Sequence, residues 1–152
     1  MSRKGSSKRK AVAPVLATLL MIAVAVAMKA GFVARSFSGM KAHVSEMIER
    51  GIAHKGFSLI DIMQPCLSFN KINTFKWYKD RCRELPADYD PADWEQAMKT
   101  AQLFEDEIPV GVIYRNDGRP PYGTGFPALK KGPLLDSPTG DDVIEKIMRS
   151  FM

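Results

Sequence analysis

The sequence predicts an α/β fold: a partial open parallel sheet, built from one βαβ unit plus an edge strand, with helices and a preceding apolar helix. Three observations support this prediction. Residues 57–63 form a short apolar run that stops before Pro65, which has no N–H for a strand ladder. Residues 32–35 form a second such run. The helical pattern of residues 40–54 lies between them, as expected for a right-handed crossover.

The first 28 residues divide into a basic segment, residues 1–10, and an uncharged segment, residues 11–28. Eighteen uncharged residues are near the lower limit for a membrane span, and a basic head before them is typical of a signal or an anchor. We therefore expect a membrane anchor and a membrane-associated protein. The alternative is a buried helix of a globular domain, which would make the protein cytoplasmic.

Charge gives no indication of nucleic-acid binding. The net charge is +5, and the five basic residues among the first ten account for it. The remainder is balanced, so a basic face for a phosphate backbone is not expected, and we predict no nucleic acid among the partners.

Downstream of residue 70 the pattern predicts helices at residues 74–85, 92–104 and 141–151, with Asp93 or Asp90 capping the second and Asp141 the third. Residues 108–114 read as a final strand at a sheet edge, because Pro109 cannot donate to a ladder. The Gly- and Pro-rich stretch from residue 115 is expected to be extended.

The two cysteines and two histidines offer few chemical groups. Cys66 follows the end of the strand at residues 57–63, where ligands gather in open α/β sheets, although a buried structural cysteine is the alternative. Cys82 shares an apolar helix face, and His43 and His54 are expected on a helix surface. No C-x-x-C pair is present, so the sequence shows no self-sufficient zinc or cluster site.

Residues 51–70, with the sequence GIAHKGFSLIDIMQPCLSFN, resemble the closing part of the β subunit of 2-oxoacid:ferredoxin oxidoreductases. The similarity extends from Lys29 through residues 34–39 to Lys130 and Lys131. It implies an oxidoreductase domain at residues 29–131 and a tail at residues 132–152 with a short helix.

The resemblance also implies cofactors and partners. The family uses thiamine diphosphate with magnesium and a 4Fe-4S cluster, and it oxidatively decarboxylates a 2-oxoacid to an acyl-CoA with electrons passing to ferredoxin. Cys66 carries over as a cluster ligand and Asn70 as a residue facing the cofactor, while an α subunit and ferredoxin are the implied partners. Neither an earlier cysteine nor a Gly-Asp-Gly segment precedes Cys66, so this chain is expected to be a fragment that is inactive alone.

Residues 8–27, with the sequence KRKAVAPVLATLLMIAVAVA, resemble the N-terminus of archaeal type IV pilins and archaellins. That resemblance implies cleavage after Lys10. It provides an alternative hypothesis, a membrane-anchored pilin-like surface or filament protein that carries a borrowed oxidoreductase fragment.

Overall fold

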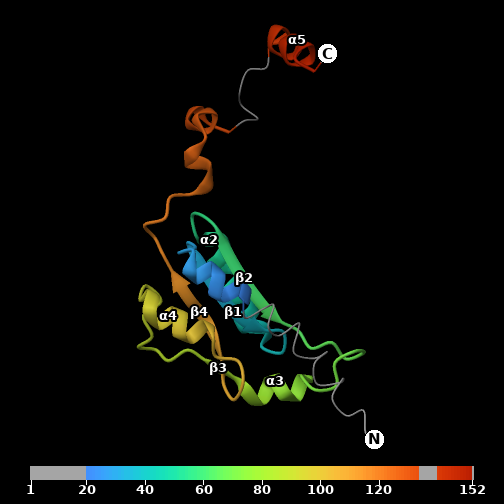
Figure 1. Cartoon of the computed structure of the whole chain (residues 1–152), viewed down its shortest axis with the longest axis vertical. Helices are drawn as coiled ribbons and strands as arrows, with labels where there is room; N and C mark the ends of the chain where they lie inside the picture. The colour runs from blue at the N-terminus through green and yellow to red at the C-terminus, as the bar shows by residue number, and fades with distance from the viewer. Residues whose placement is uncertain (1–19, 134–139, 152) are drawn as a thin grey trace, which may run out of the picture. The chain divides into compact units, whose positions relative to one another are not determined.

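The computed structural model describes residues 20–133 and 140–151 (Figure 1). The chain divides into two compact units, with the boundary between Pro120 and Pro121. The first unit carries the sheet, and the second carries short helices.

The predicted βαβ unit is confirmed. Strand β1 (Phe32–Phe37) is followed by helix α2 (Lys41–Ala53) and strand β2 (Ser58–Met63). The two strands run parallel, in a register that pairs Phe32 with Ser58 and Phe37 with Met63. Both strands therefore end at the same edge of the sheet.

The rest of the sheet differs from the prediction. Strand β4 (Ile108–Arg115) lies second to last in the order β2-β1-β4-β3, antiparallel to β1 and parallel to β3, so the sheet is mixed and β4 is not an edge strand. Pro109 is tolerated because β4 pairs with different neighbouring strands along its length. Residues 111–115 pair with β1, whereas residues 108–110 pair only with β3.

The helix expected at residues 74–85 is shorter and continues into a strand. Helix α3 (Phe75–Arg81) begins at Thr74, whose side chain accepts a hydrogen bond from the backbone N–H of Trp77. Strand β3 (Cys82–Glu84) follows directly and pairs with residues 108–110. Helix α4 (Trp94–Ala101) is shorter than the expected 92–104, and its N-cap is Asp93, one of the two expected caps, whose side chain accepts from the N–H of Gln96.

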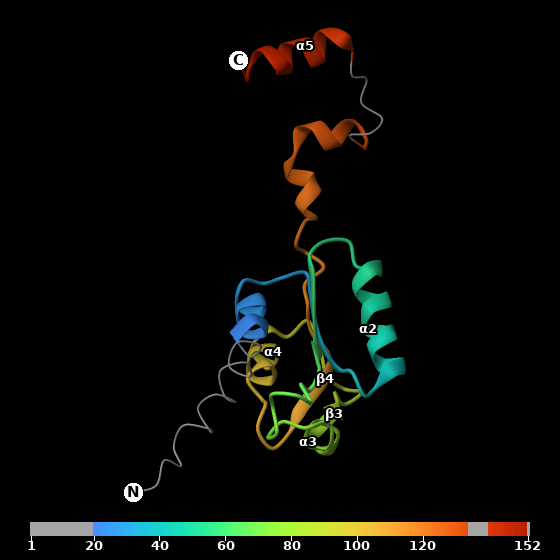
Figure 2. The same cartoon turned by 90° about the vertical axis from the view of Figure 1, so that its right-hand side faces the viewer.

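Helices cover both faces of the sheet (Figure 2). On one face, α2 packs through Met47 against Phe32, Ala34 and Val112. On the other face, α4 and the helical residues 20–27 enclose a separate cluster: Ile22, Val26, Ala30, Val33, Ala97, Ala101, Ile113 and Tyr114. Alternate residues of β1 thus serve opposite cores.

Residues 20–27 belong to this domain. Ile22 and Val26 are fully buried, and the indole Nε1 of Trp94 donates to the carbonyl oxygen of Val26 at 2.9 Å. Among the residues that the structure describes, no helix is long and apolar enough to cross a membrane. The part of the expected anchor at residues 11–19, and the expected cleavage site after Lys10, lie outside the described residues.

In the second unit, the stretch that was expected to be extended contains two 3₁₀ helices, η1 (Tyr122–Gly125) and η2 (Pro127–Lys131). Helix α5 (Asp141–Arg149) confirms the terminal helix, but its N-cap is Gly140 rather than Asp141, and no side chain caps it. Its apolar side chains are exposed: the exposed fractions of Ile144, Ile147 and Met148 are 50–61%.

Candidate functional site

The loop that follows β2 carries Cys66. The parallel strands β1 and β2 end together at Phe37 and Met63, and the N–H of Ser38 donates to the carbonyl oxygen of Met63 across that end. Cys66 lies three residues beyond β2 and is exposed. Its expected place past the carboxyl end of the strand is confirmed, and the alternative of a buried structural cysteine is wrong.

Asn70 holds this loop in shape. Its side-chain oxygen accepts from the N–H groups of Ile72 and Asn73, its amide nitrogen donates to the side-chain oxygen of Asn73, and its own N–H donates to the carbonyl oxygen of Cys66 at 3.0 Å. The bonds from Ile72 and Asn73 form an Asx-type turn at residues 70–73, and the backbone bond to Cys66 closes the loop that carries the cysteine. The expectation that Asn70 faces a cofactor stays a prediction, while its bonding within the loop is directly visible.

The loop backbone also changes the chemistry of the thiol. Hydrogen bonding from the backbone of Phe69, then of Ser68 and Asn70, lowers the pKa of Cys66, and the charge of Lys71 acts in the same direction. A lowered pKa increases the fraction of thiolate, which is the form that attacks electrophiles and binds metals. An exposed sulfur that favours the thiolate form is suited to be a metal ligand.

Cys82 is the opposite case. It packs in the core with Phe37, Tyr78 and Phe104, as predicted, although it does so from strand β3 and not from a helix face, and burial raises its pKa to about 11. A thiol of this kind stays protonated near neutral pH and is inert. Cys82 is therefore no companion ligand for Cys66.

A buried ion pair, which the sequence did not reveal, lies near the carboxyl ends of β1 and β2. Arg35 is fully buried, and its Nε is 3.5 Å from the Oδ2 of Asp61, its partner in the strand register. The two Nη atoms of Arg35 donate to the carbonyl oxygens of Ala101 and Leu103 at the end of α4, each at 3.1 Å. The pair joins β1, β2 and α4.

Burial affects both members of this pair. It raises the pKa of Asp61 and lowers that of Arg35, while the attraction between them opposes both shifts. The signal in the sequence was a charged residue inside each apolar strand. Because the register cannot be read from either strand alone, the two residues could not be paired.

The histidines differ in their burial. His43 is half-buried, and its Nδ1 lies 2.7 Å from the Oγ of Ser36, which is fully buried and therefore closed to a substrate. The expected surface position of His54 is wrong, because its side chain is only 7% exposed, with Nδ1 4.0 Å from the Oδ1 of Asp117. Both histidines connect elements of the fold.

The residues present fit part of an iron–sulfur site. Cys66 offers one thiolate, but the described part of the chain holds no group of three or more His, Cys, Asp and Glu residues that could bind a metal. A four-iron cluster takes four cysteine thiolates, so further ligands must come from elsewhere. A magnesium–diphosphate site is not matched: Gly140, in the segment nearest to a Gly-Asp-Gly, caps α5 in the second unit.

Comparison with known proteins places this loop in context. Residues 66–131 match the family model for the C-terminal region of the pyruvate ferredoxin oxidoreductase beta subunit. The chain is 34% identical over 136 residues to the 2-oxoacid:ferredoxin oxidoreductase subunit beta of a Sulfolobus species, a match that spans 82% of this chain and 44% of the relative. It is 32% identical to the beta subunit of 2-oxoacid:ferredoxin oxidoreductase 1 from Aeropyrum pernix, over 86% of this chain and 49% of the relative.

A solved structure agrees with these matches. The 2-oxoglutarate:ferredoxin oxidoreductase from Magnetococcus marinus, solved with 2-oxoglutarate, coenzyme A and succinyl-CoA bound, is 26% identical with a TM-score of 0.66. The match spans 84% of this chain and 43% of that one, so the chain spans less than half the length of the relatives that it matches. In sequence and in fold, the chain is similar to the C-terminal part of 2-oxoacid:ferredoxin oxidoreductase β subunits.

Proposed function

We propose that this chain supplies the C-terminal part of a working 2-oxoacid:ferredoxin oxidoreductase β subunit. In such an enzyme a 2-oxoacid and coenzyme A give an acyl-CoA and carbon dioxide, and two electrons pass to ferredoxin through iron–sulfur chemistry. The proposed partners are an α subunit and ferredoxin. The chain alone is proposed to be inactive, because the described residues do not fit the diphosphate site and offer one cluster ligand.

One observation supports this proposal most strongly: Cys66 is the first residue of the family match and also the exposed, thiolate-favouring cysteine of the fold. It lies at the carboxyl end of two parallel strands, where open α/β sheets hold their ligands. We propose that its thiolate is one of four cluster ligands. Asn70 would then act as a positioning residue, since its hydrogen bonds fix the loop that presents the sulfur.

The experiment is anaerobic reconstitution with iron and sulfide. The chain is combined with a polypeptide covering the part of the Sulfolobus relative that lies outside the match, and the cluster is followed by iron content and by electron paramagnetic resonance of the reduced sample. We expect a 4Fe-4S signal only in the combined sample. Cys66→Ser should abolish or strongly alter this signal, and Cys82→Ala should keep it.

Two results would contradict the proposal. One is an unchanged cluster signal in the Cys66→Ser sample. The other is loss of the signal in the Cys82→Ala sample while that variant remains folded by circular dichroism. Because Cys82 is buried, its variant also reports whether a general loss of packing explains a missing cluster.

The second hypothesis, a membrane-anchored pilin-like protein, requires the described part of the apolar segment, residues 20–28, to leave the globular domain. Burial of Ile22 and Val26 and the bond from Trp94 argue against it, because their removal would open the core on that face of the sheet. Carbonate extraction of membranes, with the intact mass of the retained protein, tests it. A membrane-bound chain that lacks residues 1–10 would support the pilin-like hypothesis.

A further inference from the structure

A positive charge is fixed on the loop that carries Cys66. The Nζ of Lys71 donates to the carbonyl oxygen of Leu67, the residue directly after the cysteine, at 2.6 Å. The residue before the lysine, Asn70, donates its N–H to the carbonyl oxygen of Cys66 at 3.0 Å. Both the side chain of Lys71 and the backbone leading into it are therefore tied back to the segment that presents the sulfur.

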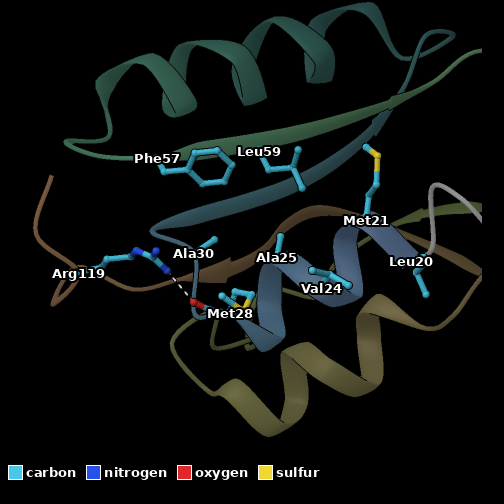
Figure 3. A pocket seen from close by; sticks show the side chains of 9 residues that line it. All are labelled: Leu20, Met21, Val24, Ala25, Met28, Ala30, Phe57, Leu59 and Arg119. Carbon is cyan, nitrogen blue, oxygen red and sulfur yellow. Dashed lines mark hydrogen bonds between the residues drawn. The ribbon is translucent and has the colours of Figure 1, made fainter. Parts of the chain in front are cut away.

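The charge of Lys71 is not cancelled by an acidic partner. Lys76 pairs with Asp80 at 2.7 Å, whereas none of the ion pairs between described residues includes Lys71. A backbone carbonyl holds a cation in place and leaves its charge intact, because the amide group is neutral. Arg119 is held in the same way at the end of an apolar groove, by the carbonyl oxygen of Met28 (Figure 3), but none of the described residues that line the groove is a cysteine.

The charge acts on the sulfur of Cys66. Attraction from Lys71 adds to the backbone hydrogen bonds in lowering the pKa of this thiol. The lysines of α3, Lys76 and Lys79, act in the same way on Asp80. A cation that stabilises a thiolate also stabilises any other negative charge that develops at that sulfur. The influence of Lys71 is therefore not limited to protonation of the thiol.

The side chains around Lys71 are apolar and uncovered. Leu67, Phe69 and Ile72 are 71%, 93% and 48% exposed. A polypeptide that brings further cysteines to Cys66 would cover these side chains and displace water from the loop. Because the local dielectric falls when water leaves, a fixed charge acts more strongly on its neighbours. Completion of the site should therefore increase the effect of Lys71 on the sulfur.

We propose that Lys71 raises the reduction potential of an iron–sulfur cluster ligated by Cys66, by holding one positive charge at the ligand loop. Each electron that the 2-oxoacid loses adds one negative charge to the cluster before it passes to ferredoxin, and a nearby positive charge favours the reduced form. Lys71 touches neither substrate nor reacting atoms in this role, so it tunes the electron transfer and is not catalytic. This inference rests on the proposed function.

The first experiment tests the charge on the full chain without iron. The rate of Cys66 alkylation is measured by peptide mass spectrometry with iodoacetate, which is anionic, and with iodoacetamide, which is neutral. The ratio of the two rates cancels the fraction of thiolate and reports the local charge. Lys71→Gln should lower this ratio at least about twofold, because it removes the attraction for the anionic reagent. Lys71→Arg should keep the ratio, and so should Lys79→Gln, which removes the same charge from α3.

The second experiment measures the reduction potential of the cluster in the sample combined with the Sulfolobus polypeptide, by redox titration followed with electron paramagnetic resonance. Lys71→Gln should shift the potential to a more negative value, equivalent to at least about a twofold change in the reduction equilibrium. Lys71→Arg and Lys79→Gln should give the potential of the unchanged chain. A purely structural role of the lysine would not produce this dependence on charge.

Equal rate ratios for the unchanged chain and Lys71→Gln, or equal potentials, would overturn the inference alone. It would also be overturned if Lys79→Gln had the same effect as Lys71→Gln, because the total charge of the chain and not its position would then be responsible. Failure of Lys71→Arg to behave as the unchanged chain would overturn it as well. Absence of a cluster from every combined sample, or a cluster unaffected by Cys66→Ser, would contradict the proposed function, and the inference would fail with it.

Discussion

Replacing Ile22 with alanine tests whether residues 20–27 are a layer of the folded domain. Ile22 is fully buried in the cluster with Val26, Val33 and Ile113. The change removes roughly three methylene equivalents at about 0.8 kcal/mol each, or about 2.4 kcal/mol of transfer free energy. The cavity adds to this, so we expect the free energy of unfolding to fall by about 2–5 kcal/mol.

The assay is urea unfolding of the full chain, followed by tryptophan fluorescence. Trp94 is a suitable probe because its indole donates to the carbonyl oxygen of Val26 in the same helix. The midpoint should move to lower urea with an unchanged slope, as expected when stability changes and compactness does not. The matched control is Leu20→Ala. Leu20 is 67% exposed, and its substitution should change stability by less than about 0.5 kcal/mol.

An Ile22→Ala variant that unfolds at the same urea concentration as the unchanged chain would refute this reasoning. The core would then not depend on the helix, and residues 11–28 would be available to act as an anchor. Equal losses for Ile22→Ala and Leu20→Ala would also refute it, since the two residues differ in burial and not in hydrophobic character.

Three further predictions concern single groups. Iodoacetamide should modify Cys66 at least about tenfold faster than Cys82, by peptide mass spectrometry, because hydrogen bonding lowers the pKa of the first thiol and burial raises that of the second; equal rates would contradict this. Burial raises the pKa of Asp61 above its value in the unfolded chain, so the folded state binds the proton more tightly. The stability of the unchanged chain should therefore rise relative to that of the Asp61→Asn variant as the pH falls through the folded pKa toward about 4, and the urea midpoints of the two proteins should diverge. Midpoints that change in parallel would contradict this prediction. Gly111→Ala should destabilise the domain by about 1–3 kcal/mol in thermal unfolding, because Gly111 has φ +139° and an added Cβ would lie 3.1 Å from the side chain of Leu85. The control is Gly118→Ala, which should have a smaller effect because Gly118 has no positive φ.

The sequence was sufficient for features that depend on local pattern. The βαβ unit follows from two apolar runs separated by a helical periodicity, and the start of α4 follows from the side-chain oxygen of Asp93. The position of Cys66 past the end of β2 has the same local origin, since Pro65 stops the ladder.

Features that depend on distant partners could not be read from the sequence. β3 has only three residues, and their local pattern continues the preceding helix. What makes them a strand is pairing with β4, whose residues lie 26 positions later in the sequence. Pro109 indicated that its strand lies at the edge of the sheet. β4 instead lies between β1 and β3, and this order depends on strands that are distant in the sequence. The pairing of Arg35 with Asp61 likewise needed the register of β1 and β2.

A single thiolate satisfies one of the four ligand positions of a 4Fe-4S cluster, so the proposed site at Cys66 depends on cysteines from another polypeptide. A substitution that keeps that polypeptide from binding should therefore abolish the cluster even when Cys66 is intact. Cys66→Ser should instead abolish the cluster and leave the binding of that polypeptide unchanged. A cluster that survives loss of the second polypeptide would be inconsistent with this arrangement.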